Sequence, residues 1–530
     1  MGNTEAVPDA RMLAGKTQVS VDAGAMFLGE FQKLSRGSRA RLKDAYVWLD
    51  YFSVPQEWLD IANADTETQH IARQMHWNST MAIRTTQDLH IRAIPFFVQA
   101  CDVFVALVPP LRHHDTGLWC NYVSWFTRGW CRCEVWCRLL LGSAKMPVVV
   151  VCSPDQADFV QPWQWANGPP TQGQFTIETD SAVIAQIMQE ALGHKLRVLE
   201  ARKKWDMYRY FAARYEVLTG QPSRKRTLAS FLADFKFDSF AAAVAETGMG
   251  PIACATLSGD AEMISFFSQA KALSNPLKGL LEVGIPNGYT PIYLAVRYAW
   301  HCPEVLQSLL ETKANPDALD MPGIPVLALC VTVRDVVTLV ENRADVNKRS
   351  AYIKVPILSL ACNACAPLGV VAKLLEMGAH VNPAAVGGFG TAHPFAHLAL
   401  TSAVNPHCLE VARLLVQAEC NINLQCRAGG FWRLVEMASR CYLQLEAGAL
   451  PARSRSVRCR VLASVFGEWT TTPLGFACLF GSEQMVHFLL EARADAELRN
   501  ARGHTAFQLA RSCSVLKLIQ EHQKQVQHSG

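Results

Sequence analysis

Thiol, aromatic, basic and carboxylate side chains crowd together in residues 127–137, between two strongly apolar segments. Thiolates are preferred zinc ligands, and the stretch holds Cys131, Cys133 and Cys137, with a histidine pair at residues 113–114 upstream. Zinc sites usually contain Cys-x-x-Cys pairs, however, and on a helix Cys133 and Cys137 share a face that Cys131 does not. We therefore predict small buried thiols and no metal site here.

Glu134, the one carboxylate of this stretch, belongs to a helix that follows an apolar strand in the predicted order of elements. Strands alternating with helices are typical of a parallel sheet covered on both faces, in which ligands bind at the carboxyl ends of the strands. Glu134 is thus expected where chemistry takes place, at the start of its helix. The predicted strands are residues 45–49, 103–108 and 146–152, and the predicted helices are residues 66–89 and 130–141.

The same elements resemble part of a Toll/interleukin-1 receptor (TIR) domain, a flavodoxin-like α/β fold. The match includes Trp130-Cys131-x-x-Glu134, the family's signature at the helix after the third strand. The resemblance covers residues 41–155, from the family's second strand to its fourth. Before residue 41 the sequence contains no apolar segment that matches the family's first strand. The matching segments are residues 46–50, 94–101, 103–108, 130–134 and 147–151.

The TIR resemblance implies two functions. In enzymatic members the matching glutamate cleaves the nicotinamide–ribose bond of NAD, so Glu134 is the candidate catalytic residue and NAD a substrate, with no resident cofactor. Glu134 would stabilise the developing oxocarbenium ion, and Trp130 or Trp125 would form the aromatic wall that holds the nucleotide. TIR domains also act by self-association. A structural alternative remains open, in which the helix dipole favours Glu134 at a helix N-terminus while Trp130 and Trp136 are core residues.

A repeated motif dominates the second half of the chain. Thr-Pro-Ile-Tyr-Leu-Ala at residues 290–295 recurs in related forms whose starts are separated by 40, 35, 31, 38, 78 and 33 residues. These spacings cluster around the ankyrin period, and the motif resembles the Thr-Pro-Leu-His-x-Ala entry of ankyrin repeats. We predict an all-α ankyrin solenoid over residues 240–512. The 78-residue spacing indicates either a decayed repeat or an insertion near residues 426–469.

The repeat register also accounts for two patterns that imitate binding sites. The Gly-Met-Gly sequence at residues 248–250 matches part of a dinucleotide fingerprint, but no strand precedes it. His393 and His397 have the spacing of a metal pair. We assign His397 to the histidine position of the repeat, where the imidazole bonds to neighbouring backbone, and predict neither a nucleotide nor a metal site.

Composition narrows the class of protein. The chain of 530 residues carries 50 basic and 46 acidic side chains, so its charge does not indicate nucleic-acid binding. No apolar run is long enough to span a membrane, and residues 1–17 lack the apolar core of a signal peptide. The 18 cysteines are then expected to be reduced thiols of a cytoplasmic protein.

Two hypotheses follow. The chain is an interaction or signalling scaffold that binds other proteins through the concave face of the ankyrin repeats, with a TIR-like domain acting by association. Alternatively, it is an NAD-cleaving signalling enzyme that uses Glu134. The predicted organisation is a weakly structured segment (1–40), the TIR-like domain (41–155), a loop and helical bridge (156–239), the repeats (240–512) and a C-terminal tail (513–530).

Overall fold

The computed structural model describes residues 92–529 with gaps at 102–103, 110, 115–116, 118, 142–147, 154–155, 160–164, 273–275, 322, 352–353, 384–392, 403–404, 406, 428–430, 449–466, 481 and 511–512. The predicted N-terminal segment, the strand at 45–49 and the helix at 66–89 lie outside the described residues. Within the described residues, no helix has both the length and the apolar character needed to cross a membrane.

A small sheet begins the described chain. Strands β1 (Phe104–Leu107) and β4 (Val148–Ser153) pair in parallel, as the two apolar segments predict. The strand β5 (Gln156–Phe159) pairs with β4 antiparallel, which the prediction of a parallel sheet did not include. Only two residues join β4 to β5, and a connection this short permits a hairpin but no parallel crossover.

Helices pack against this sheet and against each other. Helix α6 (Ile94–Ala100) precedes β1, and the hairpin β2 (Leu111–Arg112) to β3 (Trp119–Cys120) follows it. Helix α7 (Tyr122–Thr127) is capped by Asn121: the Asn121 side chain accepts the Ser124 N–H, and the Ser124 side chain accepts the Asn121 N–H. Helix α8 (Gly129–Leu141) confirms the predicted helix and carries most of its apolar side chains into the core.

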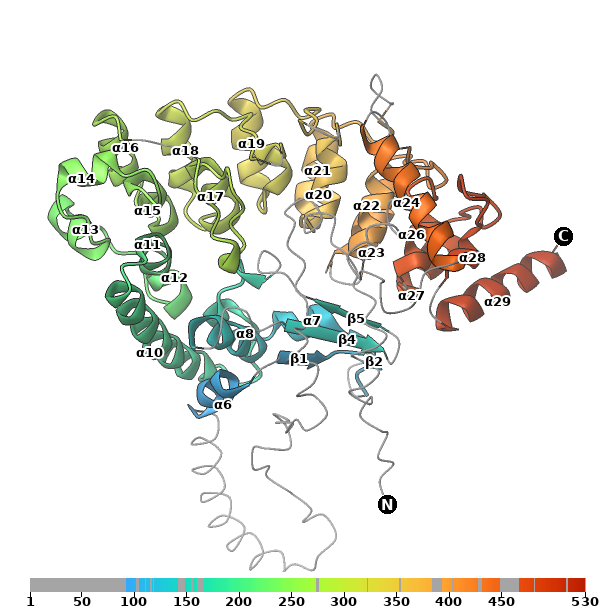
Figure 1. Ribbon diagram of the computed structural model, residues 1–530, viewed down its shortest axis with the longest axis horizontal. Coiled ribbons are helices and arrows are strands. Elements are labelled where there is room, and N and C mark those ends of the chain that lie inside the picture. Colours follow the sequence, from blue (N-terminus) through green and yellow to red (C-terminus); the bar gives the residue numbers. More distant parts are fainter. Residues whose placement is uncertain are drawn as a thin grey trace, which may run out of the picture.

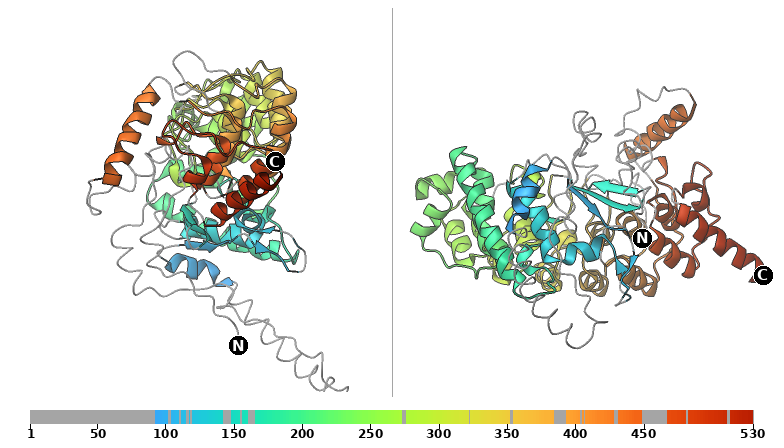
Figure 2. Two further views of the ribbon diagram at one scale, coloured as in Figure 1. Left: turned by 90° about the vertical axis from the view of Figure 1, so that its right-hand side faces the viewer. Right: turned by 90° about the horizontal axis from the view of Figure 1, so that it is seen from below.

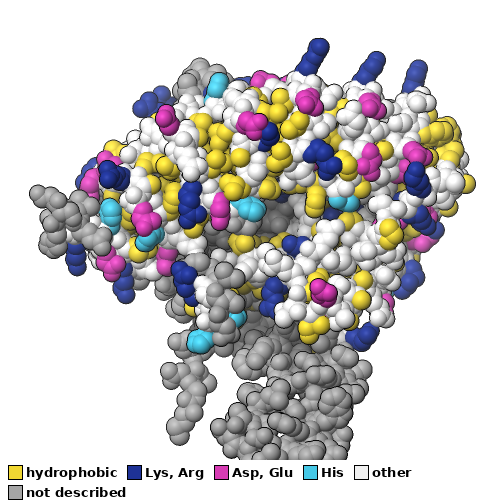
Figure 3. All heavy atoms as spheres, turned by 180° about the vertical axis from the view of Figure 1, so that it is seen from behind, with side chains coloured by type: hydrophobic (Ala, Val, Ile, Leu, Met, Phe, Trp, Pro, Cys, Tyr) yellow, Lys and Arg dark blue, Asp and Glu magenta, His cyan; other side chains and the backbone are white. Residues whose placement is uncertain are grey.

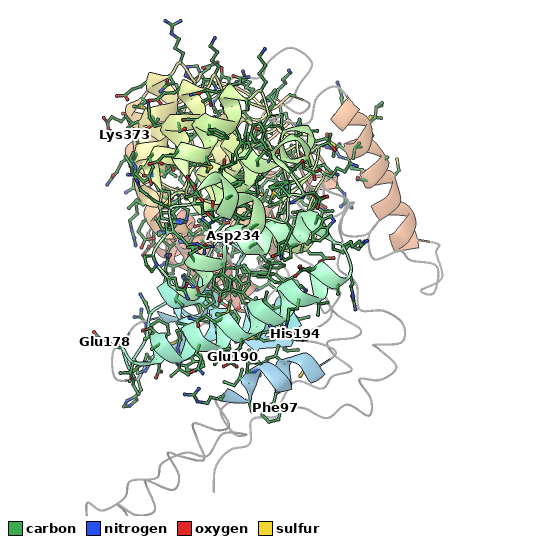
Figure 4. The ribbon with its side chains drawn as sticks, turned by 90° about the vertical axis from the view of Figure 1, so that its left-hand side faces the viewer. Phe97, Glu178, Glu190, His194, Asp234 and Lys373 are labelled. Atoms are coloured by element: carbon green, nitrogen blue, oxygen red, sulfur yellow. The ribbon has the colours of Figure 1, made fainter. Side chains whose placement is uncertain are left out.

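A helical bridge connects the sheet to the repeats. Helix α10 (Asp180–Ala201) packs on α8, and Lys195 Nζ donates to the Leu139 carbonyl at 2.9 Å. Helix α6, which carries Phe97, runs beside α10, which carries Glu190 and His194 (Figure 4). Helix α10 ends at Ala201, and the chain changes direction at Lys203, which has a φ of 53°. The remaining elements are η2 (Pro170–Gln172), α11 (Trp205–Ala213), α12 (Tyr215–Thr219), α13 (Leu228–Asp234) and α14 (Phe240–Ala245).

Seven helix pairs follow at the predicted repeat entries within the described part of the chain. Four first helices begin with a proline, whose missing N–H has no helical partner at that position in any case. The first helices are α15 (Pro251–Ser258), α17 (Pro291–Tyr298), η4 (Val326–Leu329), α20 (Ile357–Asn363), α22 (Pro394–Thr401), α26 (Pro473–Phe480) and α28 (Ala506–Leu509). The second helices are α16 (Ala261–Gln269), α18 (Pro303–Glu311), α19 (Val333–Glu341), α21 (Leu368–Glu376), α23 (Cys408–Gln417), α27 (Glu483–Glu491) and α29 (Cys513–Ser529).

The hairpin loops between repeats are joined by a ladder of hydrogen bonds. At one equivalent position in successive loops, an Asp or Asn side chain accepts the backbone N–H of the next loop, at 2.8–3.0 Å. The pairs are Asp317 with Asp345, Asn347 with His380, Asn382 with Asn421, and Asn423 with Asp495. Each loop therefore fixes its neighbour, in addition to the packing of the helices.

The last of these bonds spans the long spacing in the repeat pattern. Asn423 bonds Asp495, and α22 packs directly on α26. The long spacing is therefore an insertion between two repeats that pack on each other, and it contains helix α24 (Phe431–Gly448). Figure 2 shows α24 standing beside the repeat helices.

The repeats form an arch, and the sheet with α6–α8 lies beneath it (Figure 1). Helices α10 to α12 close the arch at one end, where α11 packs on α15. The terminal helix α29 projects from the other end (Figure 1). Repeat units need a covered end because each buries its faces only against neighbours, and the helical bridge supplies that cover at the first repeat.

Candidate functional site

The start of α8, where the TIR resemblance places its pocket, is covered by a later segment of the chain. Gly129 donates its N–H to the Gln174 carbonyl at 3.0 Å, and Gln174 donates back to Thr127 at 2.8 Å. The Phe175 ring lies so close to Gly129 that a Cβ at this position would overlap the ring. Residues 173–175 thus form one wall around the helix start.

The two candidate aromatic residues are engaged in separate contacts. Trp130 donates its indole N–H to Asp180 Oδ2 at 2.8 Å, which joins the first turn of α8 to the start of α10. Trp125 lies in an aromatic cluster on α7, with ring centroids 6.4 Å from Phe104 and 5.9 Å from Tyr122. Both side chains are partly buried against the core.

Glu134 is half-buried in the second turn of α8. The helix begins at Gly129, so the prediction that Glu134 opens the helix, with its dipole explanation, is wrong; the first turn contains no acidic residue. Trp130 lies four residues before Glu134, which puts both side chains on one face of the helix. The structure therefore keeps the candidate pair on one face of α8, with Trp130 in the first turn of the helix and Glu134 in the second.

The thiols of α8 are core residues. Cys133 and Cys137 share a face, as predicted, with their sulfur atoms 4.0 Å apart, and Cys131 is also buried. The contact with Cys137, followed by burial, raises the pKa of Cys133 well above its ordinary value, so the thiol stays protonated. Among the described residues no group of His, Cys, Asp or Glu is arranged to hold a metal ion.

The glycine loop before α15 already has its anionic partners. Glu246 accepts the backbone N–H groups of Thr247 at 2.9 Å and Gly248 at 3.0 Å, and Asp206 accepts that of Met249 at 2.8 Å. These carboxylates take the donors that a phosphate would need. The loop is therefore an internal connection between the bridge and the first repeat.

The histidine prediction in the repeat containing α22 is wrong. Counted from Pro394, Ala396 occupies the histidine position of the motif, and His397 takes the next, core position that Leu294 holds in α17. His397 is 4% exposed, and neither ring nitrogen has a hydrogen-bond partner. Burial lowers the pKa of His397 to about 4, so the ring is neutral near pH 7.

The hairpin that connects α18 to η4 presents exposed apolar side chains on a rigid support. Leu319 is 39% exposed and Met321 55%. Beneath them Tyr293 Oη donates to the carbonyls of Ala318, at 2.8 Å, and Ile324, at 2.5 Å. Sequence reasoning missed this pair; the available signal was two apolar residues in a loop that the repeat pattern leaves variable.

The visible surface of the arm mixes side chains of all kinds. Figure 3 shows hydrophobic, basic and acidic groups interleaved over this face, without a patch of one sign of charge. Proteins that bind nucleic acid concentrate basic side chains on one face. The face in Figure 3 is instead suited to protein contacts, in which apolar anchors are surrounded by polar groups.

Residues 287–321, which comprise α17, α18 and the hairpin of Leu319 and Met321, match the family model of the ankyrin repeat. The arm is an ankyrin-like solenoid. The ankyrin repeat domain of Bcl-3, described as a unique member of the IkappaB protein family, is similar at 23% identity and a TM-score of 0.33, over 52% of this chain and 100% of that chain. The human ASB11 ankyrin repeat domain is similar at 21% identity and a TM-score of 0.26, over 44% of this chain and 98% of that chain. No curated protein sequence matches the chain.

Proposed function

We propose that this chain is a cytoplasmic signalling scaffold whose ankyrin-like arm binds a partner protein through its concave side. The observation that carries the proposal is the continuous stack of helix pairs with its ladder of hairpin bonds. Such a stack presents variable loop residues at fixed spacing on a rigid frame, and ankyrin-like solenoids use these surfaces to bind other proteins.

Leu319 and Met321 are the proposed anchors of this interface. Both project from a hairpin that Tyr293 fixes from below, so their ordering costs little entropy on binding. The carboxylate of Asp320 accepts the Ile324 N–H at 2.7 Å, which holds the loop between the two anchors. An apolar pair on a rigid loop is typical of interface hot spots.

The test compares partner capture by four forms of the full chain. A partner recovered with the wild type and identified by mass spectrometry is purified and titrated against Leu319→Ala/Met321→Ala, against Leu434→Ala/Met437→Ala, and against the combination. We expect at least a tenfold loss of affinity for the hairpin variant and none for the α24 variant. A partner that binds all four forms equally would contradict the proposed interface.

The sheet unit is proposed to act by association. Val105, Leu107 and Leu111 are 43%, 50% and 60% exposed, and these apolar side chains lie on β1 and on the adjoining hairpin strand β2. Contacts between copies would remove this surface from water. Sedimentation equilibrium should show a concentration-dependent increase in mass, and Leu111→Asp should abolish it. The control Leu368→Asp makes the same substitution at an exposed leucine on α21, far from this surface, and should preserve the increase.

NAD cleavage by the sheet unit is the second candidate function. It is favoured by Trp130 and Glu134 lying on one face of α8, with Glu134 half-buried. A carboxylate in a partly dry site could stabilise the positive charge that develops as nicotinamide departs. If the proposal holds, purified wild type releases nicotinamide and Glu134→Gln does not. Equal rates in the two proteins would eliminate it.

A further inference from the structure

The insertion carries an amphipathic helix that the stack does not use. Gln425, just before the insertion, donates to the Arg499 carbonyl at 2.8 Å, and Glu468, near the end of the insertion, accepts from Asn500. Both ends are therefore held at one hairpin of the last repeats. Between them α24 makes no extensive contact with any other described helix or strand, and it stands at the margin of the molecule in Figures 2 and 4.

In residues 433–441, the part of α24 whose side chains the structure describes, the outward face is largely apolar. Leu434 is 62% exposed and Met437 53%, and Cys441 is also exposed. These residues follow the spacing i, i+3 and i+7, which aligns them in one stripe along a helix. On the far side of the helix the polar residues Glu436 and Ser439 are buried, the reverse of the usual orientation of a surface helix.

Positive charge borders this stripe. Arg433 is exposed and lies four residues before Met437, and Arg440 forms an ion pair with Glu436 along the same edge. Residues 427–460 contain seven arginines and two glutamates, a net charge of +5, whereas the whole chain has only +4. The rest of the chain is thus almost neutral, while the sequence of the insertion is basic, and Arg433 and Arg440 are the basic residues that the structure shows beside the apolar stripe.

We propose that α24 is a docking helix for a second partner protein, one that receives it in an apolar groove with an acidic rim. Amphipathic helices enter such grooves through anchors at i, i+3 and i+7, and flanking arginines pair with acidic side chains at the rim. Within residues 433–441 the exposed apolar side chains, those of Leu434, Met437, Ala438 and Cys441, lie within an arc of about 100° at 100° per residue.

This interaction is independent of the one proposed for the hairpins. It uses residues 433–441 of the insertion, whereas the proposed ankyrin interface uses Leu319 and Met321. The two surfaces would let the chain hold two partners at once, and the Asn423–Asp495 bond keeps the stack intact across the insertion that presents the helix.

Calcium-loaded calmodulin is a suitable probe, because calcium opens methionine-rich apolar grooves in it. The full chain is titrated with calmodulin in calcium and in EGTA, by isothermal calorimetry. We expect binding in calcium only, weakened at least tenfold by Leu434→Ala/Met437→Ala. The matched control, Leu319→Ala/Met321→Ala, exchanges the same residue types on the hairpin and should bind as the wild type does. Arg433→Glu places a negative charge beside the acidic rim of the groove. Because salt screens this repulsion, the variant should bind more weakly as the salt concentration falls.

Three results would overturn the proposal: the absence of calcium-dependent binding, equal affinity of the α24 and control variants, or binding of wild type to vesicles with anionic headgroups that the α24 variant loses. The last result would assign the helix to a lipid surface. Circular dichroism of each variant verifies that it is folded, and the substitutions affect only exposed side chains. The two proposals fail separately: if the Leu319/Met321 variant lost no partner, the hairpin interface would be wrong, while the calmodulin titration would still test α24.

Discussion

The guanidinium of Arg214 lies 5.3 Å from the ring centroid of Tyr298 in α17, and this contact joins the helical bridge to the second repeat. The same guanidinium lies 5.7 Å from the ring of Trp136 in α8. Its Nη1 donates to the Ala166 carbonyl and to Tyr210 Oη, both at 2.8 Å. One cation with an exposed fraction of 1% thus connects the sheet unit, the bridge and the arm.

Removing this cation should loosen the sheet unit from the arm. Arg214→Ala deletes two hydrogen bonds and leaves a cavity among three aromatic rings, so we expect a loss of about 2–4 kcal/mol in the free energy of unfolding. Hydrogen exchange should accelerate in α8 and α17, with little change in the distant α26.

The matched variant for this site is Tyr298→Phe. It keeps the ring beside Arg214 but removes the hydroxyl that donates to the Gly284 carbonyl at 2.9 Å, so it should cost about 1 kcal/mol. If Arg214→Ala were as stable as Tyr298→Phe, the Arg214 guanidinium would not stabilise the protein more than a single hydroxyl group does.

Acid should destabilise the arm at the repeat of His393 and His397. Burial lowers the pKa of both to about 4, and the charge of His397 adds to the effect on His393. In the unfolded chain each imidazole has its ordinary pKa of about 6.5, so the unfolded state binds more protons between pH 6.5 and pH 4. The contribution of the two neutral rings to the free energy of unfolding is therefore fully present above pH 6.5. It declines as the pH falls, by up to about 3 kcal/mol for each ring.

His397→Leu checks this assignment. Leucine matches the core character of Leu294 and removes two nitrogen atoms that have no partner, so the variant should be more stable than wild type by about 1–2 kcal/mol at pH 7. Urea unfolding from pH 7 to pH 4.5 should show a smaller decline for the variant. An identical decline would place the acid-sensitive group elsewhere.

Asp320 should make the stability of the arm depend on pH in the opposite direction to the two histidines. Burial raises its pKa to about 7, although the N–H groups of Gly323 and Ile324 favour the charged form. A folded-state pKa above the ordinary value means that the contribution is present in acid and lost as the pH rises through 7. Asp320→Asn can accept the same N–H groups without a charge, so its stability advantage should grow from pH 4 to pH 8, reaching about 1–3 kcal/mol.

The control for Asp320 is Asp317→Asn, which changes a partly exposed carboxylate three residues earlier in the same hairpin. Asp317 also accepts a backbone N–H, that of Asp345. The unfolding midpoint of this variant should show no comparable growth with pH. A parallel response of both variants would mean that general surface charge, and not the burial of Asp320, sets the pH dependence.

The repeats were predictable because an entry motif related to Thr-Pro-Ile-Tyr-Leu-Ala recurs at the first helix of each pair, and the same physical requirement produces each copy. The error at His397 arose from the register: Pro394 fixes the helix start, and counting from it moves the histidine into the core. The direction of β5 was not anticipated, because it depends on the short turn after β4 that the strand pattern alone does not reveal.

The joint at Arg214 had no signal in the sequence. Its partners are Trp136, Ala166, Tyr210 and Tyr298, which come from four segments separated by up to 162 positions. A buried arginine is unusual, but nothing local distinguishes it from the exposed arginines of the bridge. Long-range polar contacts of this kind become visible only when the packing of the elements is known.

Removing the insertion should leave the arm folded. Gln425 and Glu468 both bond to the hairpin at residues 499–500, so the two ends of the insertion lie near one another and a short Gly/Ser linker in place of residues 428–466 can connect them. Shortening the loop also reduces its closure entropy slightly. We expect a thermal unfolding midpoint within about 3 °C of wild type, since α22 still packs on α26 and Asn423 still bonds Asp495. A drop of 10 °C or more in differential scanning calorimetry would mean that the segment stabilises the stack as a repeat does.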